Sequence, residues 1–402
     1  MSNIGRQFPS EMETYTDQST GRKITRLTKS GDNYQFYFTE NSFTEGEHEI
    51  IYQHSETPLF EKGMVNLFAM DLKTGIRTQL TDFATQFKQV GAFCFDKSND
   101  SKIIIFVADK DLYRLDRESG QITQLYKTPQ EFNITGLNLS YDNRYVILTL
   151  SEIPKYDREF SKTNYDGMVE EFYAIKRARI VLLNIDGSNA QVIFQDTQHI
   201  NHVQFAPDSN EYVMFCHEGP WNRVGQRIWL LNTLTRTVEP CFRQKEEDSV
   251  GHEFWTRDGL ICFENRGAGF DGTITVDKKQ ATTLMNDYEE AMPKVGFADR
   301  NGNIKRIVKI PFYCNHYHAN KSNTLLVADG VSELVLIDIS KDEPIVEKLC
   351  DHNTSWISHN THCHPTWSWS NDKILFASDR DRLGYAQLYL IDVPFGQGKK
   401  SE

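Results

Sequence analysis

A pattern of four short strands recurs along nearly the whole chain of 402 residues. Each copy has an apolar or aromatic strand, a polar turn, a β-rich strand, an L-x-x-x-D strand with a Gly or Asn turn, and a last strand. Four-strand copies spaced by roughly 40 to 50 residues are typical of β-propeller blades. The approximate bounds of the copies are 34–82, 89–127, 134–196, 200–243, 250–310, 314–350 and 359–394. The pattern therefore predicts an all-β fold, a seven-bladed β-propeller.

The seventh copy ends after its third strand, and residues 22–29, RKITRLTK, look like a last blade strand with nothing before it. Pairing of this N-terminal strand with the last blade would close the ring and remove an exposed sheet edge. We therefore expect residues 1–402 to form one domain. Insertions at 152–178 and 267–296 interrupt two copies, and we expect them to emerge as loops on one face.

Charge and hydropathy restrict the partners of the chain. The formal net charge of -12 argues against nucleic acid as the main partner. No apolar run is long enough for a signal-peptide core or a membrane span, so we expect a cytoplasmic protein without a membrane partner. The seven cysteines are dispersed and odd in number, which favours reduced, mostly buried thiols. The oligomeric state is not indicated.

Three histidines, His359, His362 and His364, stand close together with the spacing H-x-x-H-x-H. In an extended strand His362 and His364 would point the same way, because side chains alternate between faces. For any one of them a hydrogen-bonded structural role is the simpler interpretation. For three within six residues a metal site is at least as well favoured, because imidazole is the commonest ligand of transition metals.

Ten of the twelve histidines lie between His199 and His364, and four of them share one register. These four stand six or eight positions before the first turn of successive copies, and they are His202, His252, His316 and His364. Equal parity would aim them into one central channel, where some could bind a divalent metal and another could act as a general base. Arg227 lies 25 residues before His252, and its fork suits a carboxylate, although a salt-bridged surface role is the common alternative.

Several short motifs are more specific than the repeat pattern. They are YFTENSF (37–43), CHEGP (216–220), QRIW (226–229), GHEFW (251–255), CNHYHAN (314–320), HNTSW (352–356) and H-x-x-H-x-HP (359–365). In these motifs the chain resembles the oligogalacturonate lyases over nearly its whole length. The resemblance implies a seven-bladed propeller that uses a divalent metal, usually Mn2+, to cleave short oligogalacturonides by β-elimination inside the bacterial cell.

The resemblance also implies roles for individual residues. The implied metal ligands are His316, His359, His362 and His364. His252 is the implied catalytic base, and Arg227 the implied catalytic and substrate-binding arginine. His217 and His202 are further candidates for substrate contact, with a structural role for each as an equal alternative. His359 stands where the family has Gln, and an added imidazole favours later transition metals, so the metal's identity and direct coordination by His359 stay open.

The implied reaction is cleavage of di- and trigalacturonate in pectin degradation, with release of an unsaturated uronate, 5-keto-4-deoxyuronate. A metal ion and an arginine would stabilise the enolate-like charge while His252 removes the C5 proton. Water or a tyrosine would protonate the leaving oxygen. Two alternatives stay open: a non-enzymatic propeller that binds a ligand or a protein, and a lyase for a related uronate. The histidine register argues against the binding protein. The sequence does not distinguish a lyase for a related uronate from a lyase for di- and trigalacturonate.

Overall fold

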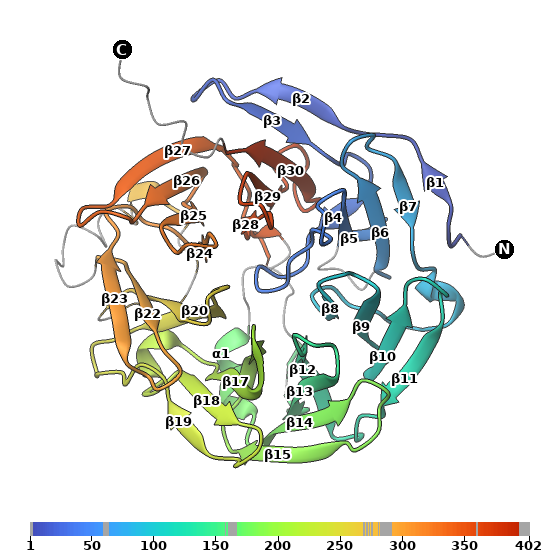
Figure 1. The fold of residues 1–402 in the computed structure, drawn as a ribbon, viewed down its shortest axis with the longest axis vertical. Coiled ribbons are helices and arrows are strands. Elements are labelled where there is room, and N and C mark those ends of the chain that lie inside the picture. The colour runs from blue at the N-terminus through green and yellow to red at the C-terminus, as the bar shows by residue number, and fades with distance from the viewer. Residues whose placement is uncertain are drawn as a thin grey trace. The chain divides into compact units, whose positions relative to one another are not determined.

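A computed structural model describes residues 3–58, 64–156, 158–159, 167–267, 270, 272, 274, 276–279, 281, 292–358 and 361–393. The chain divides into two compact units, residues 1–86 with 314–402 and residues 87–313. The described residues form seven antiparallel sheets, three in the first unit and four in the second (Figure 1). Each sheet takes most of its strands from one of the predicted copies.

The first unit holds two five-stranded sheets and one four-stranded sheet. In spatial order, the first is β1 (Gln7–Phe8), β7 (Arg77–Gln79), β6 (Asn66–Asp71), β5 (Glu49–Ser55) and β4 (Asp32–Tyr34). The second is β2 (Glu13–Thr16), β3 (Lys23–Arg26), β30 (Gln387–Asp392), β29 (Lys373–Ser378) and β28 (Thr366–Trp367). The third is β24 (His316–Ala319), β25 (Leu325–Asp329), β26 (Glu333–Asp338) and β27 (Ile345–Asp351). A 3-10 turn, η1 (Phe83–Thr85), follows β7.

The second unit holds four sheets of four strands. In spatial order, the first is β11 (Ile122–Tyr126), β10 (Asp111–Asp116), β9 (Ile103–Ala108) and β8 (Phe95–Lys97). The second is β12 (Phe132–Leu139), β13 (Tyr145–Glu152), β14 (Ala178–Asn184) and β15 (Gln191–Asp196). The third is β16 (Ile200–Ala206), β17 (Ser209–His217), β18 (Ile228–Asn232) and β19 (Val238–Pro240). The fourth is β20 (Val250–Trp255), β21 (Ile261–Asn265), β22 (Lys294–Ala298) and β23 (Ile304–Lys309). The helix α1 (Met168–Ala174) and the 3-10 turn η2 (Trp221–Arg223) lie in the connections.

Apolar side chains fill the spaces between neighbouring sheets of the second unit. One cluster joins Ile105 and Leu112 to Val146 and Leu148 of the next sheet. The strand β13, with the sequence YVILTLSE, is buried at nearly every position. A strand covered on both faces is expected to be a continuous apolar run, because neither face meets water. Burial of apolar area, at about 25 cal/mol per Å², is therefore the main stabilising contribution here.

The turn that ends each L-x-x-x-D strand is built from local hydrogen bonds. Oδ1 of Asp71 accepts from the Thr74 N–H at 2.7 Å, and the Gly75 N–H donates to the Asp71 carbonyl at 2.8 Å. Gly75 has φ +73°, a left-handed conformation that glycine adopts without a steric cost. The same two hydrogen bonds recur in the turns that begin at Asp17, Asp116 and Asn232. The Asp17 turn joins β2 to β3, so the N-terminal hairpin carries the turn of the repeat.

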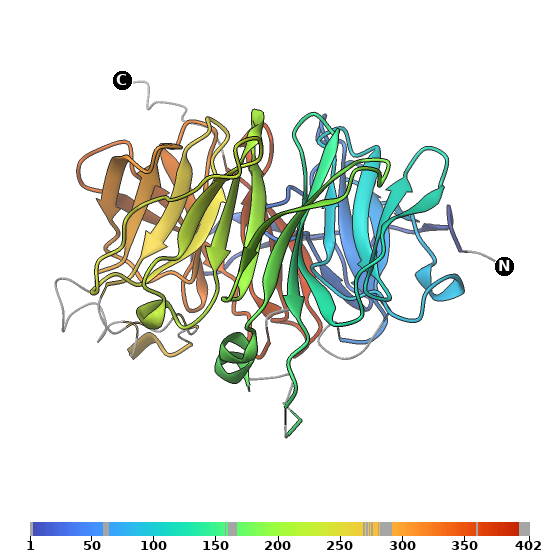
Figure 2. The same ribbon diagram turned by 90° about the horizontal axis from the view of Figure 1, so that it is seen from below.

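The strand β3 lies within the predicted closing segment 22–29 and pairs with β30, with Ile24 opposite Ile391. Closure of a complete ring and the single-domain organisation stay predictions. The sequence did not predict β1 and β2, because two and four residues are too short for a recognisable alternation. It also did not predict α1, which lies in the insertion at 152–178 and extends beyond the ends of the neighbouring strands (Figure 2).

No helix in the described part of the chain is long and apolar enough to cross a membrane. All seven cysteines are free thiols, and six of them are buried, as their dispersed positions predict. Most of the second predicted insertion, at 267–296, lies outside the described residues.

Candidate metal centre and active site

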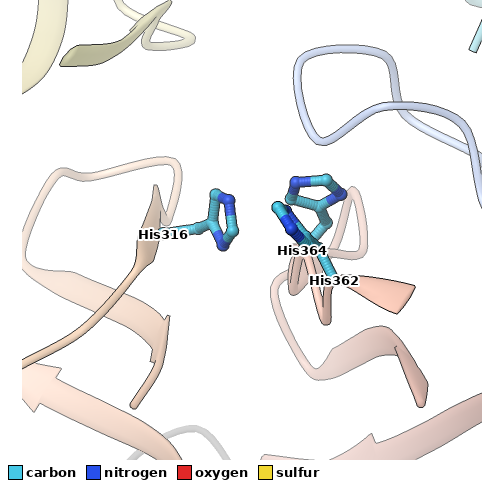
Figure 3. Close-up of side chains that lie close together, drawn as sticks. All are labelled: His316, His362 and His364. Atoms are coloured by element: carbon cyan, nitrogen blue, oxygen red, sulfur yellow. The ribbon is translucent and has the colours of Figure 1, made fainter. Parts of the chain in front are cut away.

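Three of the four predicted metal ligands come together in the first unit. His316 begins β24, and His362 and His364 lie in the segment just before β28. One ring nitrogen from each lies within 4.8 Å of the others, and all three side chains are buried. Figure 3 shows the imidazoles turned toward one another, with ring centroids of His316 and His364 4.2 Å apart. We call these three residues the histidine cluster. The fourth predicted ligand, His359, lies outside the described residues.

Hydrogen bonds to Nδ1 orient two of these rings. Oδ1 of Asp329, opposite His316 in the sheet, accepts from the His316 backbone N–H at 2.6 Å, and Oδ2 lies 2.9 Å from Nδ1 of the same histidine. The Tyr34 hydroxyl donates to the His362 carbonyl and lies 2.6 Å from Nδ1 of His364. Because a phenol has one proton, its oxygen must accept from Nδ1 of His364. In His364 Nδ1 is thereby the N–H, and Nε2 carries the lone pair that a metal needs. An ionised Asp329 requires the same tautomer of His316.

The donor set of the histidine cluster fits a divalent transition metal. Neutral imidazoles with an oriented Nδ1–H are the usual form of histidine ligands. Burial raises the pKa of the Asp329 carboxyl well above its ordinary value, and the electrostatic interaction with His352 and the hydrogen bond from the His316 backbone N–H act against that rise. Aromatic rings surround the cluster, with the ring centroids of Trp356 and His362 5.3 Å apart and those of Phe38 and His364 5.8 Å apart. Such a shell limits the access of water to a bound ion.

The four histidines of the predicted common register fall in both units. His202 and His252 belong to the second unit, and His316 and His364 to the first, so their common channel stays a prediction. Three of the four nevertheless share one local structure, because His202, His252 and His364 have φ of 49°, 46° and 43°. In β16 and β20 the pairing register shifts at the histidine, so that two residues oppose one. Such bulges re-aim side chains and are common beside functional sites.

His252, the predicted base, is held by a carboxylate. Glu264, on the neighbouring strand β21, forms a short hydrogen bond with Nδ1 of His252. Burial lowers the pKa of His252 well below 6.5, and the nearby Arg266 and Arg227 lower it further. The imidazole is therefore neutral at pH 7, as a general base must be. The Trp221 ring packs edge-on against it, with ring centroids 4.9 Å apart.

Arg227, the predicted substrate-binding residue, is 1% exposed and already holds two carboxylates. Its Nε donates to Glu253 at 2.7 Å, and Nη1 and Nη2 donate to Glu218 at 2.9 and 3.2 Å. Nδ1 of His202 lies 2.8 Å from Glu253, which completes a group that we call the arginine cluster: Arg227, Glu218, Glu253 and His202. Direct contact of Arg227 with a substrate carboxylate would require these carboxylates to share it, and that contact stays a prediction.

His217 has partners for both ring nitrogens. Nδ1 accepts from the Trp229 indole N–H at 3.2 Å, and Nε2 lies 3.0 Å from the Asp196 carboxylate. Its residue exposure is 6%. The hydrogen bonds support the structural alternative for His217, and its predicted contact with substrate stays a prediction.

A second group with possible ligand atoms, His202, Cys216 and Glu253, does not fit a metal. Nε of Arg227 lies 2.7 Å from Glu253, so the charge of this carboxylate is already balanced by a guanidinium. Burial raises the pKa of the Cys216 thiol well above 9.0, and only the thiolate is a good ligand. The histidine cluster is therefore the better candidate for the metal centre.

The acidic partners of these histidines were not predicted from the sequence. Glu264 and Asp329 stand near the ends of the apolar strands ICFEN and LLVAD. Charged residues are rarely buried unless they are paired, so a carboxylate at the end of an apolar strand is a usable signal. Glu218 and Glu253 directly follow histidines in the motifs CHEGP and GHEFW. A glutamate beside a candidate histidine is therefore a second usable signal.

Comparisons with known proteins give a consistent result. A family model described as oligogalacturonate lyase matches residues 2–396. An oligogalacturonide lyase of Pectobacterium atrosepticum is 26% identical over 97% of this chain and 98% of its own length. An oligogalacturonate lyase of Dickeya dadantii is 25% identical, with the same shares covered.

Solved structures show the same likeness. An oligogalacturonate lyase in complex with manganese matches with a TM-score of 0.79 and 25% identity, covering 98% of each chain. The oligogalacturonate lyase of Vibrio parahaemolyticus matches with a TM-score of 0.81 and 24% identity over 98% of this chain and 99% of its own. With the seven sheets, these likenesses confirm the predicted fold class, an all-β, seven-bladed β-propeller.

Proposed function

The chain belongs to the oligogalacturonate lyase family, and we propose that it cleaves di- and trigalacturonate by β-elimination with a divalent metal ion. Family membership makes the protein a lyase. The proposed product, released in pectin degradation, is an unsaturated uronate with a C4=C5 double bond, and 5-keto-4-deoxyuronate is its open-chain tautomer. The observation that carries the proposal is the histidine cluster, in which Asp329 and Tyr34 orient two imidazoles for metal binding.

His316, His362 and His364 would hold the metal ion, and His359 is a fourth candidate ligand. When bound, the ion supplies Lewis acidity that stabilises negative charge on the uronate carboxylate. We propose Mn2+, because the relative of known structure is in complex with manganese. Imidazole-rich sites also suit later transition metals, so the test must compare several ions.

His252 would remove the proton from C5 of the uronate through Nε2, the ring nitrogen that does not face Glu264. The electron pair of the C5–H bond then forms the C4=C5 double bond as the C4–O4 bond breaks. The leaving oxygen takes a proton from water or from a tyrosine. The lowered pKa of His252 supports this role, because a neutral imidazole accepts a proton at pH 7.

Within the arginine cluster, Arg227 and His202 are the proposed contacts to the substrate, and the two carboxylates already offset the charge of Arg227. Arg227 could reach a uronate carboxylate only in competition with Glu218 and Glu253. His202 has a side chain that is 13% exposed, and it is the better candidate for substrate contact than His217, whose side chain is 8% exposed. The cytoplasmic location and the absence of nucleic-acid partners stay predictions.

Mass spectrometry of the products tests the reaction. The protein is incubated with trigalacturonate as isolated, after chelation, and after chelation followed by Mn2+, Zn2+ or Ni2+. Fragments whose masses sum to that of the substrate, lost on chelation and restored by Mn2+, are the expected result. Fragments heavier by one water would show hydrolysis and refute the elimination. Absence of cleavage in every sample would favour a binding protein, or a lyase for a related uronate if other uronates are cleaved.

A further inference from the structure

A buried chain of contacts leads from His252 through Glu264 and Arg266 to Tyr313. Oε1 of Glu264 faces Nδ1 of His252. Oε2 accepts from Nε of Arg266 at 2.8 Å, and Nη2 of Arg266 lies 2.8 Å from the same oxygen. Nη1 of Arg266 donates to the Tyr313 hydroxyl at 2.8 Å. The side chains of Glu264 and Arg266 are 1% and 2% exposed, so water does not compete for these contacts.

Aromatic rings hold the Arg266 guanidinium in place. Its carbon lies 4.5 Å from the ring centroid of Phe270, 4.9 Å from that of Tyr313 and 5.4 Å from that of Trp221. A guanidinium carries only donors, and here Nε–H donates to one oxygen of Glu264 while Nη2 lies beside the same oxygen. The atom of residue 264 that faces Arg266 must therefore be an acceptor.

We infer that Glu264 is the positioning residue that fixes the tautomer of His252, and that Arg266 fixes the orientation of Glu264. A carboxylate bound to Arg266 has no proton to donate, so the contact with His252 requires Nδ1–H. The lone pair of the imidazole is then on Nε2, which is the nitrogen that removes the substrate proton. The inference rests on the proposed function only for the identity of the reaction, since the tautomer is a property of the protein.

The variant Glu264→Gln tests the inference because the side chain keeps its shape while one acceptor oxygen becomes an NH2 donor. Arg266 has only donors, so the amide oxygen would face Arg266 and the amide NH2 would face Nδ1 of His252. The imidazole must then accept at Nδ1 and carry its proton on Nε2, where it cannot act as a base. We expect kcat to fall on the order of 10²- to 10⁴-fold, with KM changed much less.

A second change separates tautomer control from a merely structural role. The double variant Glu264→Gln, Arg266→Met removes the donors of Arg266, so the amide can rotate and its oxygen can accept from Nδ1–H of His252. We expect this double variant to be at least 10-fold more active than Glu264→Gln alone, since the correct tautomer is restored. If residue 264 only filled space, loss of Arg266 would add further damage.

Nitrogen NMR of protein labelled with ¹⁵N-histidine gives a readout that does not depend on activity. The His252 signals are assigned by their loss in His252→Gln. We expect a protonated Nδ1 in the wild type, a protonated Nε2 in Glu264→Gln, and a return to Nδ1 in the double variant. The same tautomer in all three proteins, or unchanged kcat in Glu264→Gln, would overturn the inference. If the wild type cleaves no uronate but the tautomer of His252 still differs between the wild type and Glu264→Gln, the proposed function is refuted and the inference stands.

Discussion

Replacement of Arg227 by Met should destabilise the fold by an amount that the structure allows us to bound. The guanidinium makes three hydrogen bonds of 3.2 Å or less to Glu218 and Glu253, whose side chains are 11% and 0% exposed. Charge-assisted hydrogen bonds contribute about 1.5–3 kcal/mol each, but removal of Arg227 also removes its own desolvation cost. Breaking a buried ion pair by removing one partner typically costs about 3–5 kcal/mol, and we expect that range for Arg227→Met.

Part of this stability should depend on pH through Glu218. Burial by itself raises the pKa of Glu218, but Arg227 and His202 lower it from 4.5 to about 2. The difference between these values corresponds to about 3 kcal/mol, at about 1.36 kcal/mol for each pKa unit. Because the folded-state pKa is the lower one, this stability is present above pH 4.5 and is lost as the pH falls toward 2. The loss should be smaller in Arg227→Met.

Guanidinium unfolding of metal-free protein, followed by far-UV circular dichroism at pH 7 and across pH 2–5, measures both effects. Arg300→Met is the matched control, since Arg300 pairs with the exposed Asp208 and should change the free energy of unfolding by less than about 1 kcal/mol. The triple variant Arg227→Met, Glu218→Gln, Glu253→Gln should recover most of the loss, because it leaves no buried carboxylate unpaired. A single variant within about 1 kcal/mol of wild type, or a triple variant no better than the single, would refute the reasoning.

Three further predictions concern the metal and the base. His316→Ala and His362→Ala should lose bound metal in atomic emission analysis while the exposed His48→Ala keeps it, and metal retained in either cluster variant would contradict the ligand assignment. Tyr34→Phe should weaken metal affinity by about 10- to 100-fold in competition with a chromogenic chelator, because one imidazole loses the acceptor for its Nδ1–H; unchanged affinity would remove that role. Because burial lowers the pKa of His252 well below 6.5, kcat/KM should persist as the pH falls through 6.5 and drop only below it, and an acidic limb centred above 6.5 would exclude His252 as the base.

The fold could be predicted from the sequence because the same four-strand pattern recurs in successive copies along the chain. Strand β13 begins with four consecutive apolar residues, YVIL, and the turn that begins at Asp71 recurs with similar residue types elsewhere. The added edge strands could not be predicted, since β1 has two residues and β2 has four. Pairing of such short segments is decided by the sheet that they join, which the local sequence does not describe.

The metal candidates could also be predicted, but their supporting residues could not. His362 and His364 were found from their spacing, whereas Tyr34 contacts His364 from 330 positions away along the chain. No local pattern marks a tyrosine as the partner of a distant histidine. For Arg227 the sequence predicted a substrate contact, and only the fold shows that two buried carboxylates already hold its guanidinium.

Bulges at His202 and His252 limit how far strand alternation can be read from the sequence. A bulge adds one residue to a strand, so alternation counted across it assigns later side chains to the wrong face. His202, His252 and His364 all have positive φ, which costs a non-glycine residue on the order of 1 kcal/mol or more. Glycine would adopt this conformation without strain but has no imidazole, so histidine at all three positions indicates that the ring itself is needed. His316 stands in a regular strand, where Asp329 lies directly opposite and contacts Nδ1, whereas bulges set the direction of His202 and His252.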